Sequence, residues 1–580
     1  MSLLPFGELT PYEARRFVPA RARMGDWAEV EPLFDQLEQR LDAARDGAAL
    51  ATWLEDWSEL SAALDEEMAR RYIAMTCHTD DPEAEKGYLE FVEQVEPRTK
   101  PRQFRLERLY LRHPAVGDLP EETYEVFNRG VRVSVGLFRE ENVPLETEEA
   151  RLGQQYQKVT GGMTVEFDGK EQTLVQMGRY QEDPDRALRQ QAWETVVARR
   201  LKEREVFDGL FDQLADLRGR IAKNAGFDSY LGYAFRRLQR FDYTPEDCLG
   251  FHAAVEAEVM PLVRELQETR RRQMGVETLR PWDLGVDPLG RPALKPFQGG
   301  AELTDRTARV FEQLDPELAA GFRRMDDLRL LDLDNRKGKA PGGYQYSLAE
   351  ARLPFIFMNA VGLQRDVETL FHEAGHAFHA LAAQDQPLHA YRHAPIEFCE
   401  VASMSMELLG NDFLGAFYGD EEARRAKRKH LEGVIDVLPW IATVDAFQHW
   451  LYTHPGHGTE ERRDAWSELM KRFGGTVDWS GHEAARASLW HRQLHIFLHP
   501  FYYIEYGLAQ LGALQVWANY RRDRSGALGD YKAALALGGS RPLPDLFAAA
   551  GARLCFEPAD LRPLMLLVRG ELSRLQDRGG

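Results

Sequence analysis

The chain has 580 residues, 44% of them hydrophobic, so it can bury a large core, and its length alone suggests several domains. Its formal net charge of −20 disfavours a nucleic-acid backbone or an anionic membrane surface as a partner. The four cysteines, Cys77, Cys248, Cys399 and Cys555, are widely spaced without a paired metal-binding pattern, which is typical of reduced thiols in a reducing compartment.

The N-terminal residues, Met-Ser-Leu-Leu-Pro-Phe-Gly-Glu, contain no basic segment followed by an apolar one, so they do not indicate a secretory signal. No uncharged apolar run reaches the roughly 20 residues that a transmembrane helix requires. We therefore expect a cytoplasmic protein that has no membrane partner.

Residues 26–96 are rich in Leu, Ala, Glu and Arg, with apolar residues at helical spacing. The clearest stripe consists of Val30, Leu33, Phe34, Leu37 and Leu41. This pattern predicts two long helices packed as a hairpin, whose apolar stripes are buried against the rest of the chain. Pro97 and Pro101 predict a break, after which further helices run to about residue 157.

A β-hairpin is predicted where the helical periodicity stops. Residues 163–167 alternate apolar and polar side chains, Asp168-Gly169 is a turn signal, and residues 171–175 can return as the partner strand. The run Asp183-Pro184-Asp185 is expected to cap a helix that starts near Arg186. We therefore predict a mainly helical chain with an N-terminal helical domain over residues 1–190 and a second domain over residues 191–580.

Helices are expected again from about residue 186 to 275, followed by a loop spaced by prolines and glycines at 281–296. Residues 338–344 are rich in glycine but lack the P-loop pattern, so phosphate binding is not expected. Residues 354–359 form a short predicted strand, and an extended peptide could pair with its exposed edge.

Residues 369–379, Thr-Leu-Phe-His-Glu-Ala-Gly-His-Ala-Phe-His, contain the pattern His-Glu-x-x-His on a predicted helix. His372 and His376 lie one helical turn apart, so both imidazoles can reach a single Zn²⁺. Glu373 lies beside the same face and can take a proton from a metal-bound water. The alternative is a pair of surface histidines on an ordinary helix.

A second helix is predicted to begin at Pro395, with Glu400, Ser403 and Glu407 on one face. A catalytic zinc takes three protein ligands and keeps one open position, so Glu400 is the candidate third ligand. Glu407 is placed to hold the free ring N–H of a ligand histidine. His379 is a turn too far for shared ligation and is expected behind the ligands or in the cleft. A solvated helix face is the alternative for both glutamates.

The run 372–379, followed by Phe-Cys-Glu-Val-Ala-Ser-Met-Ser-Met-Glu at 398–407, resembles the oligoendopeptidase F branch of the thimet oligopeptidase family of zinc peptidases. In that family the glutamate that opens the Glu-x-x-Ser element is the third zinc ligand, which corresponds to Glu400. The resemblance covers most of the chain and is strongest from about residue 330 to 510. It implies a two-lobed helical zincin-type metallopeptidase with a small hairpin, a short active-site sheet and one Zn²⁺ per chain.

The resemblance also suggests residues that contact the substrate. The glycine-rich loop is similar to a mobile loop near the family's cleft, which makes Gly342, Gly343, Tyr344 and Phe357 candidate substrate-binding residues, although a plain turn is the alternative. The implied channel admits short unfolded peptides and excludes folded proteins.

The segment Phe-Tyr-Tyr-Ile-Glu-Tyr-Gly at 501–507 carries several phenol groups. The family places a histidine and two tyrosines, three residues apart, against the substrate carbonyl. The resemblance assigns these roles to His495, Tyr503 and Tyr506. Because the spacing from His495 to Tyr503 departs by one residue from the thimet form, His499 is the rival histidine. Core aromatic residues with satisfied hydroxyls are the alternative reading of the tyrosines.

These features together predict a zinc-dependent endopeptidase that hydrolyses internal bonds of short oligopeptides. A dipeptide-releasing zinc carboxypeptidase of the same family is an alternative, and it would need a cationic group to fix the substrate carboxylate. The sequence has many arginines, and none can be assigned that role. A non-catalytic peptide-binding helical protein with incidental histidines is the alternative from a different class.

Overall fold

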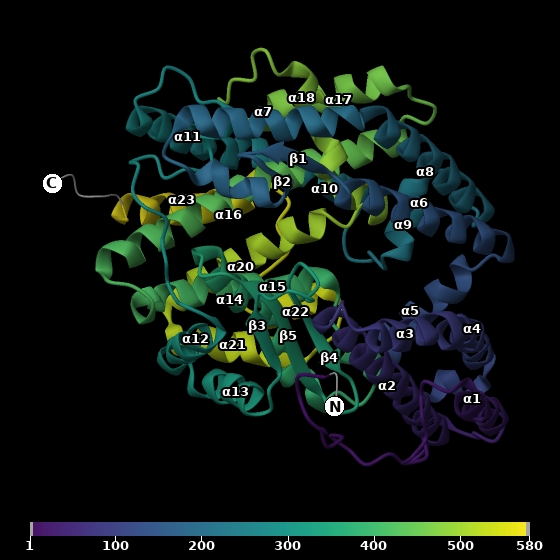
Figure 1. The fold of residues 1–580 in the computed structure, drawn as a ribbon. Helices are drawn as coiled ribbons and strands as arrows, with labels where there is room; N and C mark the ends of the chain where they lie inside the picture. The colour runs from purple at the N-terminus through teal and green to yellow at the C-terminus, as the bar shows by residue number, and fades with distance from the viewer. Residues whose placement is uncertain (1–3, 576–580) are drawn as a thin grey trace. The chain divides into compact units, whose positions relative to one another are not determined.

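A computed structural model of the chain describes residues 4–575. Helices make up most of this range, and the strands form two small sheets (Figure 1). The predicted mainly helical class is confirmed. Among the described residues, no helix combines the length and the apolar character needed to cross a bilayer.

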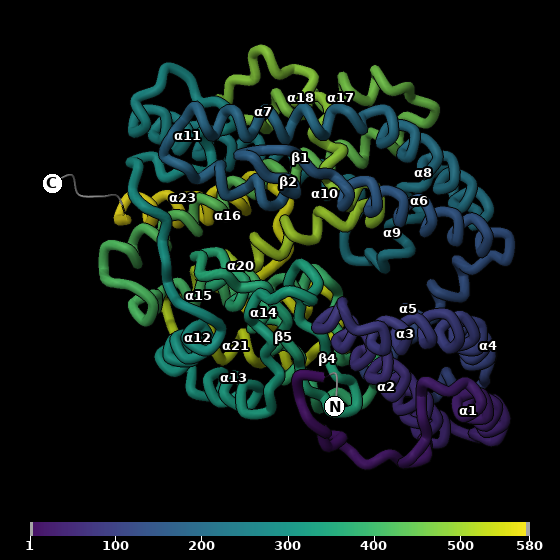
Figure 2. The backbone as a smooth tube through the Cα atoms, viewed as in Figure 1, coloured from purple at the N-terminus to yellow at the C-terminus, as the bar shows by residue number. Residues whose placement is uncertain are grey.

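The chain divides into two compact units, each assembled from three separate segments. The first unit comprises Met1–Gly136, Leu294–Lys427 and Ala509–Leu554, and the second comprises Leu137–Ala293, Arg428–Leu508 and Cys555–Gly580. Figure 2 shows the segments of the first unit in purple, in teal to green, and in yellow. The domain boundary near residue 190 stays a prediction.

The first unit contains the two helices that carry His372, His376 and Glu400. Its helices are α1 (Trp27–Leu41), α2 (Gly47–Cys77), α3 (Pro82–Glu90), α4 (Glu96–Arg112), α5 (Glu121–Leu137), α12 (Gly300–Leu314), α13 (Pro316–Asp327), α14 (Gln364–Ala382), α15 (Ile396–Gly410), α21 (Arg524–Ala536) and α22 (Leu543–Ala549). Its strands are β3 (Leu331–Asp334), β4 (Tyr344–Leu348) and β5 (Leu353–Ala360).

The second unit is also helical, with one hairpin. It contains α6 (Val143–Gly161), β1 (Thr164–Phe167), β2 (Lys170–Thr173), α7 (Arg186–Lys202), α8 (Arg204–Asn224), α9 (Tyr230–Arg237), α10 (Pro245–Ala254), α11 (Met260–Met274), α17 (Thr459–Phe473), α18 (Glu483–Ala487), α19 (Leu494–Leu498) and α23 (Pro558–Arg574). The sequence of α16 (Asp420–Thr453) and that of α20 (Ile504–Arg522) each include residues of both units.

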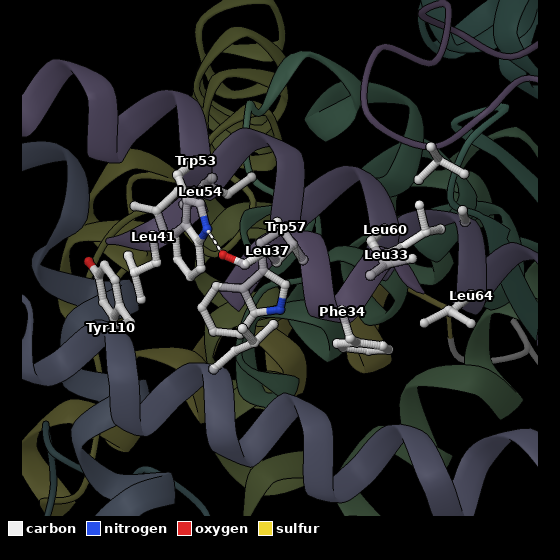
Figure 3. Close-up of a cluster of buried hydrophobic side chains, with 14 of the residues drawn as sticks. Leu33, Phe34, Leu37, Leu41, Trp53, Leu54, Trp57, Leu60, Leu64 and Tyr110 are labelled. Atoms are coloured by element: carbon white, nitrogen blue, oxygen red, sulfur yellow. Dashed lines mark hydrogen bonds between the residues drawn. The ribbon is translucent and has the colours of Figure 1, made fainter. Parts of the chain in front are cut away.

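The N-terminal helices pack as predicted. The five apolar residues expected on one stripe of α1 are all buried. Figure 3 shows four of them, Leu33, Phe34, Leu37 and Leu41, beside Trp53, Trp57 and Leu60 of α2. The indole N–H of Trp53 donates a hydrogen bond to the Leu37 carbonyl at 2.8 Å. The same core includes Leu388 and Tyr391 from the segment after α14. The N-terminal arm therefore buries its apolar stripes within the first unit.

The prediction of a break at Pro97 and Pro101 is wrong. Both prolines lie inside α4, Pro97 in the first turn and Pro101 one turn later. A proline in the first turn loses nothing, because the N–H groups there have no helical partner, and its fixed φ favours the helix. Pro97 therefore helps to begin this helix, whereas Pro101 lies in its interior and lacks the N–H that would bond the carbonyl four residues back.

The sheet of the first unit has the strand order β3-β5-β4. β5 pairs in parallel with β3 and antiparallel with β4, so both of its sides are hydrogen-bonded. The strand predicted at 354–359 is confirmed, but the expectation that it offers an exposed edge is wrong. Its continuous apolar run is the pattern of a fully buried central strand. Within the described chain, β4 is an edge strand.

The predicted hairpin is confirmed in the second unit. β1 pairs antiparallel with β2, with Phe167 opposite Lys170. Asp168 has φ 54° and Gly169 has φ 69°, as a two-residue turn between twisted strands requires. Asp185 caps α7 by accepting from the Ala187 N–H.

Candidate functional site

The helices α14 and α15 lie very close together, and a glycine makes this possible. A Cβ atom on Gly375 would come within 2.5 Å of the Ser403 Cα atom and 2.7 Å of the Ala402 carbonyl oxygen. No side chain fits there, so the two backbones touch. The Tyr531 hydroxyl, from α21, donates a 2.8 Å hydrogen bond to the same Ala402 carbonyl and so ties α15 to α21.

This close packing brings three potential metal ligands to a common point. His372 Nε2 lies 3.2 Å from His376 Nε2 and 3.4 Å from Glu400 Oε2, and the His376–Glu400 distance is 3.9 Å. A triangle with these sides has a point about 2.0 Å from each corner, which matches the length of zinc–nitrogen and zinc–oxygen bonds. The three side chains therefore fit a single metal ion.

Neighbouring groups hold the three side chains in place. The His372 Nδ1–H donates to Glu407 Oε1 at 2.7 Å, which leaves Nε2 to face the other two ligands. The Ser403 hydroxyl donates to Glu400 Oε2 at 3.1 Å. The backbone of Cys399 hydrogen-bonds the His376 ring. The predicted register of 400, 403 and 407 on one helix face is the one observed.

The charges within this cluster shift the proton affinities of its members. Burial alone would lower the pKa of His372, but the Glu407 hydrogen bond and the nearby carboxylates raise it to about 9. Burial, together with the neighbouring His372 and His379, holds the pKa of His376 well below its usual value. A metal ion must therefore compete with a proton at His372, while His376 already offers a free nitrogen.

Glu373 is buried beside this cluster. Burial, with the nearby charge of Glu400, raises its pKa to about 7 despite the opposing charge of His372. The backbone of Gln345, in the edge strand β4, hydrogen-bonds the Glu373 carboxylate. Its proton affinity is thus matched to neutral pH, where a general base works best.

His379 does not join the three ligands. It is buried behind them, edge-on to the Phe398 ring at 5.8 Å between centroids, and its Nε2 atom has no hydrogen-bond partner. Burial, and to a smaller extent the charge of His393, lowers its pKa to about 4. It therefore packs as a neutral ring.

The glycine-rich loop is tied to the sheet. The Asn359 side-chain amide donates to the Ala340 and Gly342 carbonyls at 2.8 and 2.9 Å, and Gly342 has φ 103°, which favours glycine. Tyr344 stacks on Phe357 at 4.8 Å between centroids, and the Phe357 side chain is fully buried. The loop and Tyr344 are therefore accessible for contact with a peptide, whereas the buried Phe357 ring is part of the core.

The aromatic residues predicted at 495–506 form a cluster within the second unit. The His495 ring centroid lies 4.9 Å from that of Tyr503 and 5.9 Å from that of Tyr506, and the two tyrosine rings are 5.4 Å apart. The Gln493 amide orients His495 through its Nδ1 atom at 2.7 Å. His495 therefore contacts both tyrosines, whereas the His499 ring lies against the rings of His495 and Tyr502.

A sharp turn sets the direction of these tyrosines. Phe501 has φ 67°, and its N–H donates to the Gln448 side chain at 2.7 Å. Its carbonyl accepts from the Arg240 guanidinium, which is also paired with Glu505 at 2.9 Å.

Burial, and to a smaller extent the charge of His499, lowers the pKa of His495 to about 4, so the His495 ring is neutral at ordinary pH.

No sequence pattern described above gives a role to Gly375, Gln345 or the backbone of Cys399. Gly375 did carry a signal, because a glycine between two ligand histidines, on the face toward a second helix, indicates close helix packing. Gln345 and Cys399 contribute through backbone groups, which leave no mark on the residue type.

Comparisons with known proteins agree over most of the chain. A family model described as "Peptidase family M3" matches residues 179–566, and one described as "Peptidase M3 N-terminal domain" matches residues 17–138. The solved structure "PZ peptidase A with inhibitor 2" has a TM-score of 0.88 and 29% identity, covering 97% of this chain and 100% of that one. A solved putative oligoendopeptidase F has a TM-score of 0.87 and 30% identity, with 97% and 99% covered.

Curated proteins match over shorter stretches. Oligopeptidase PepF of Bacillus subtilis (strain 168) is 24% identical over 297 residues, which are 50% of this chain and 43% of the relative. The chromosomal oligoendopeptidase F of Lactococcus lactis subsp. cremoris is 25% identical over 173 residues, 30% and 28% of the two chains. The chain thus spans less than half the length of these two curated relatives.

Proposed function

Because this chain belongs to peptidase family M3, in its oligoendopeptidase F branch, we propose that it is a zinc-dependent endopeptidase acting on internal bonds of short oligopeptides. The observation that carries the proposal is the triangle of His372, His376 and Glu400 atoms, with the Glu373 carboxylate beside it. Three protein ligands leave a position open for water or substrate, as in catalytic zinc sites.

Zinc in this triangle would act as a Lewis acid toward a water molecule and the scissile carbonyl. Glu373 accepts the proton of the attacking water and then delivers it to the leaving amine. Its pKa of about 7 suits both steps, because the group can be either base or acid near neutral pH. Glu407 keeps the His372 ring in the tautomer whose Nε2 faces the ligands.

The edge strand β4 supports the substrate class. An extended peptide that pairs with this edge is recognised through its main chain, so its side chains are free to vary. We assign Gly342, Gly343 and Tyr344 to the substrate side of this region. Loose sequence preference and a need for an unfolded substrate follow from recognition of this kind.

The oxyanion donors are assigned by family resemblance to Tyr503 and Tyr506, with His495 as their companion. The ring contacts of His495 with both tyrosines support choosing it over His499. Three of the four cysteines, Cys77, Cys248 and Cys555, are buried as thiols, which fits the reducing cytoplasm as the location.

Replacing Glu373 by Gln tests the proposal. We expect Glu373→Gln to keep about one zinc at this site and to lose about 10²–10⁴-fold in kcat on a fluorogenic octapeptide, because only proton transfer is removed. Wild-type turnover in this variant would remove Glu373 from the mechanism. Absence of hydrolysis by the zinc-loaded wild type across a mixed peptide library would favour a binding protein.

A peptide blocked at both ends separates endopeptidase from carboxypeptidase activity. We expect cleavage of an N-acetylated, C-amidated octapeptide at internal bonds, detected by mass spectrometry of the products. Cleavage of the free-carboxylate peptide only, with release of C-terminal dipeptides, would instead assign the chain to the carboxypeptidase class.

A further inference from the structure

A second set of metal-ligand side chains lies deep in the second unit, on α10 and α16. Cys248 and His252 are one helical turn apart on α10, and Asp445 and His449 are one turn apart on α16. The ligand atoms of Cys248, Asp445 and His449 all lie within 4.8 Å of one another. His252 Nε2 is 2.8 Å from Asp445 Oδ2, so the His252 side chain adjoins this group of three through Asp445.

This cluster is buried but incompletely hydrogen-bonded. The exposed fractions of Cys248 and Asp445 are 0%, that of His252 is 2% and that of His449 is 6%. Asp445 Oδ1 has no hydrogen-bond partner, and His449 Nε2 makes only a long contact with Asp445 Oδ2, at 3.4 Å. An unsatisfied buried polar atom destabilises the folded state, and a buried carboxylate oxygen does so more strongly. A cation shared by both atoms would remove this destabilisation.

The distances are close to those of a tetrahedral site. Two ligand atoms on a tetrahedral zinc lie about 3.3 Å apart, because each bond is about 2.0–2.1 Å long. His449 Nε2 lies 3.4 Å from Asp445 Oδ2. Two residues one turn apart on each of two facing helices can supply four ligands without distorting either helix. The Cys248 Sγ atom lies within 4.8 Å of the ligand atoms of Asp445 and His449.

We propose that Cys248, His252, Asp445 and His449 form a second, structural zinc site. A thiolate and a carboxylate together balance the charge of Zn²⁺, so the loaded site is neutral and its burial is favourable. A set with one thiolate and two imidazoles selects zinc over Mg²⁺ or Ca²⁺. Four protein ligands fill the coordination sphere, which is the pattern of structural sites. The site is independent of the proposed peptidase activity.

The nearby charged groups permit a cation here. Arg240 acts electrostatically on Cys248, but its guanidinium is paired with Glu505 at 2.9 Å. The site also borders the turn that carries the tyrosines: the His449 ring is edge-on to Phe501 at 5.5 Å. Zinc here would join α10 to α16 beneath that turn and hold it in position.

Cobalt substitution tests the proposal on the whole chain. Cobalt bound to a thiolate gives a charge-transfer band in the near ultraviolet, and the triangle around His372 contains no sulfur ligand. We expect two Co²⁺ per wild-type chain and a thiolate band that persists in His376→Ala. The band should disappear in Cys248→Ala and remain in the control Cys399→Ala, whose thiol adjoins the first site.

Zinc content gives a second readout that does not depend on the spectrum. After dialysis, mass spectrometry should find about two zinc ions per wild-type chain and about one in Cys248→Ala. Zinc should also raise the unfolding temperature of His376→Ala but not of the double variant His376→Ala/Cys248→Ala. No thiolate band at saturating Co²⁺, or a band that survives Cys248→Ala, would overturn the proposal and leave a buried ion pair of Asp445 with histidine.

Discussion

Replacing Gly375 by alanine should separate the two helices that carry the proposed zinc ligands. The new Cβ atom would lie 2.5 Å from the Ser403 Cα, whereas ordinary contacts begin at 3.4 Å. Both neighbours are backbone atoms, so no side chain can rotate away. The helices α14 and α15 must therefore move apart by about 1 Å. Zinc sites tolerate deviations of only about 0.2 Å in bond length, so this movement should disrupt the ligand triangle.

The magnitudes follow from this displacement. Backbone overpacking costs about 1–3 kcal/mol, and the higher helix propensity of alanine returns about 1 kcal/mol, so the net loss of stability is small. The effect on function is larger. A shift of about 1 Å in Glu400 should weaken zinc binding at least 10–100-fold and lower kcat/KM about 10²-fold.

Zinc content after gel filtration and hydrolysis of a fluorogenic peptide measure the two effects. Gly219→Ala is the matched control, because Gly219 lies within α8 and an added Cβ would meet nothing within 4 Å. The control should keep its zinc and activity and gain up to about 1 kcal/mol in stability. Wild-type zinc content and more than half the activity in Gly375→Ala would refute the argument from helix spacing.

Three further predictions concern neighbours of the proposed site. Glu407→Gln should weaken zinc binding about 10–100-fold in a chelator competition, because His372 loses its charged partner; an unchanged affinity would contradict this. The pKa of His379 is lowered to about 4, so the unfolded chain binds the proton first, and stability is lost as pH falls from about 6.5 to 4. In metal-free protein, the free energy of unfolding measured in urea should fall by about 3 kcal/mol less for His379→Phe than for the wild type between pH 6.5 and 4. An equal fall in both proteins would contradict this prediction. Tyr506→Phe should lower kcat about 10²–10³-fold with zinc content unchanged, and a change below threefold would remove this hydroxyl from the mechanism.

Local patterns predicted the elements whose cause is local. The apolar stripe of α1, the Asp168-Gly169 turn and the Asp185 cap depend on neighbouring residues, and all three are observed. The prolines of α4 were misread because Pro97 can either end a helix or begin one. That choice depends on the residues that follow and on packing against α1, which lies far away in the sequence.

The side chains of the candidate metal site could be predicted from their spacing in the sequence. The spacing of His372, His376 and Glu400 predicted that their side chains converge, and their ligand atoms lie within 4.8 Å of one another, while their role as metal ligands stays a prediction. The cluster of Cys248 with Asp445 has no such signal, because its halves lie almost 200 residues apart and each half alone is only an i, i+4 pair. Tertiary packing alone brings these pairs together.

The order of segments in the first unit has a consequence for synthesis on the ribosome. The metal-ligand helices α14 and α15 rest on α21 and α22, which follow more than 110 residues later in the chain. Until those helices leave the exit tunnel, the apolar sides of α14 and α15 lack their cover, and the Ala402 carbonyl lacks the Tyr531 hydroxyl. A nascent chain can therefore acquire a finished ligand triangle only after residues 524–549 have left the tunnel, which delays the proposed peptide hydrolysis until that point.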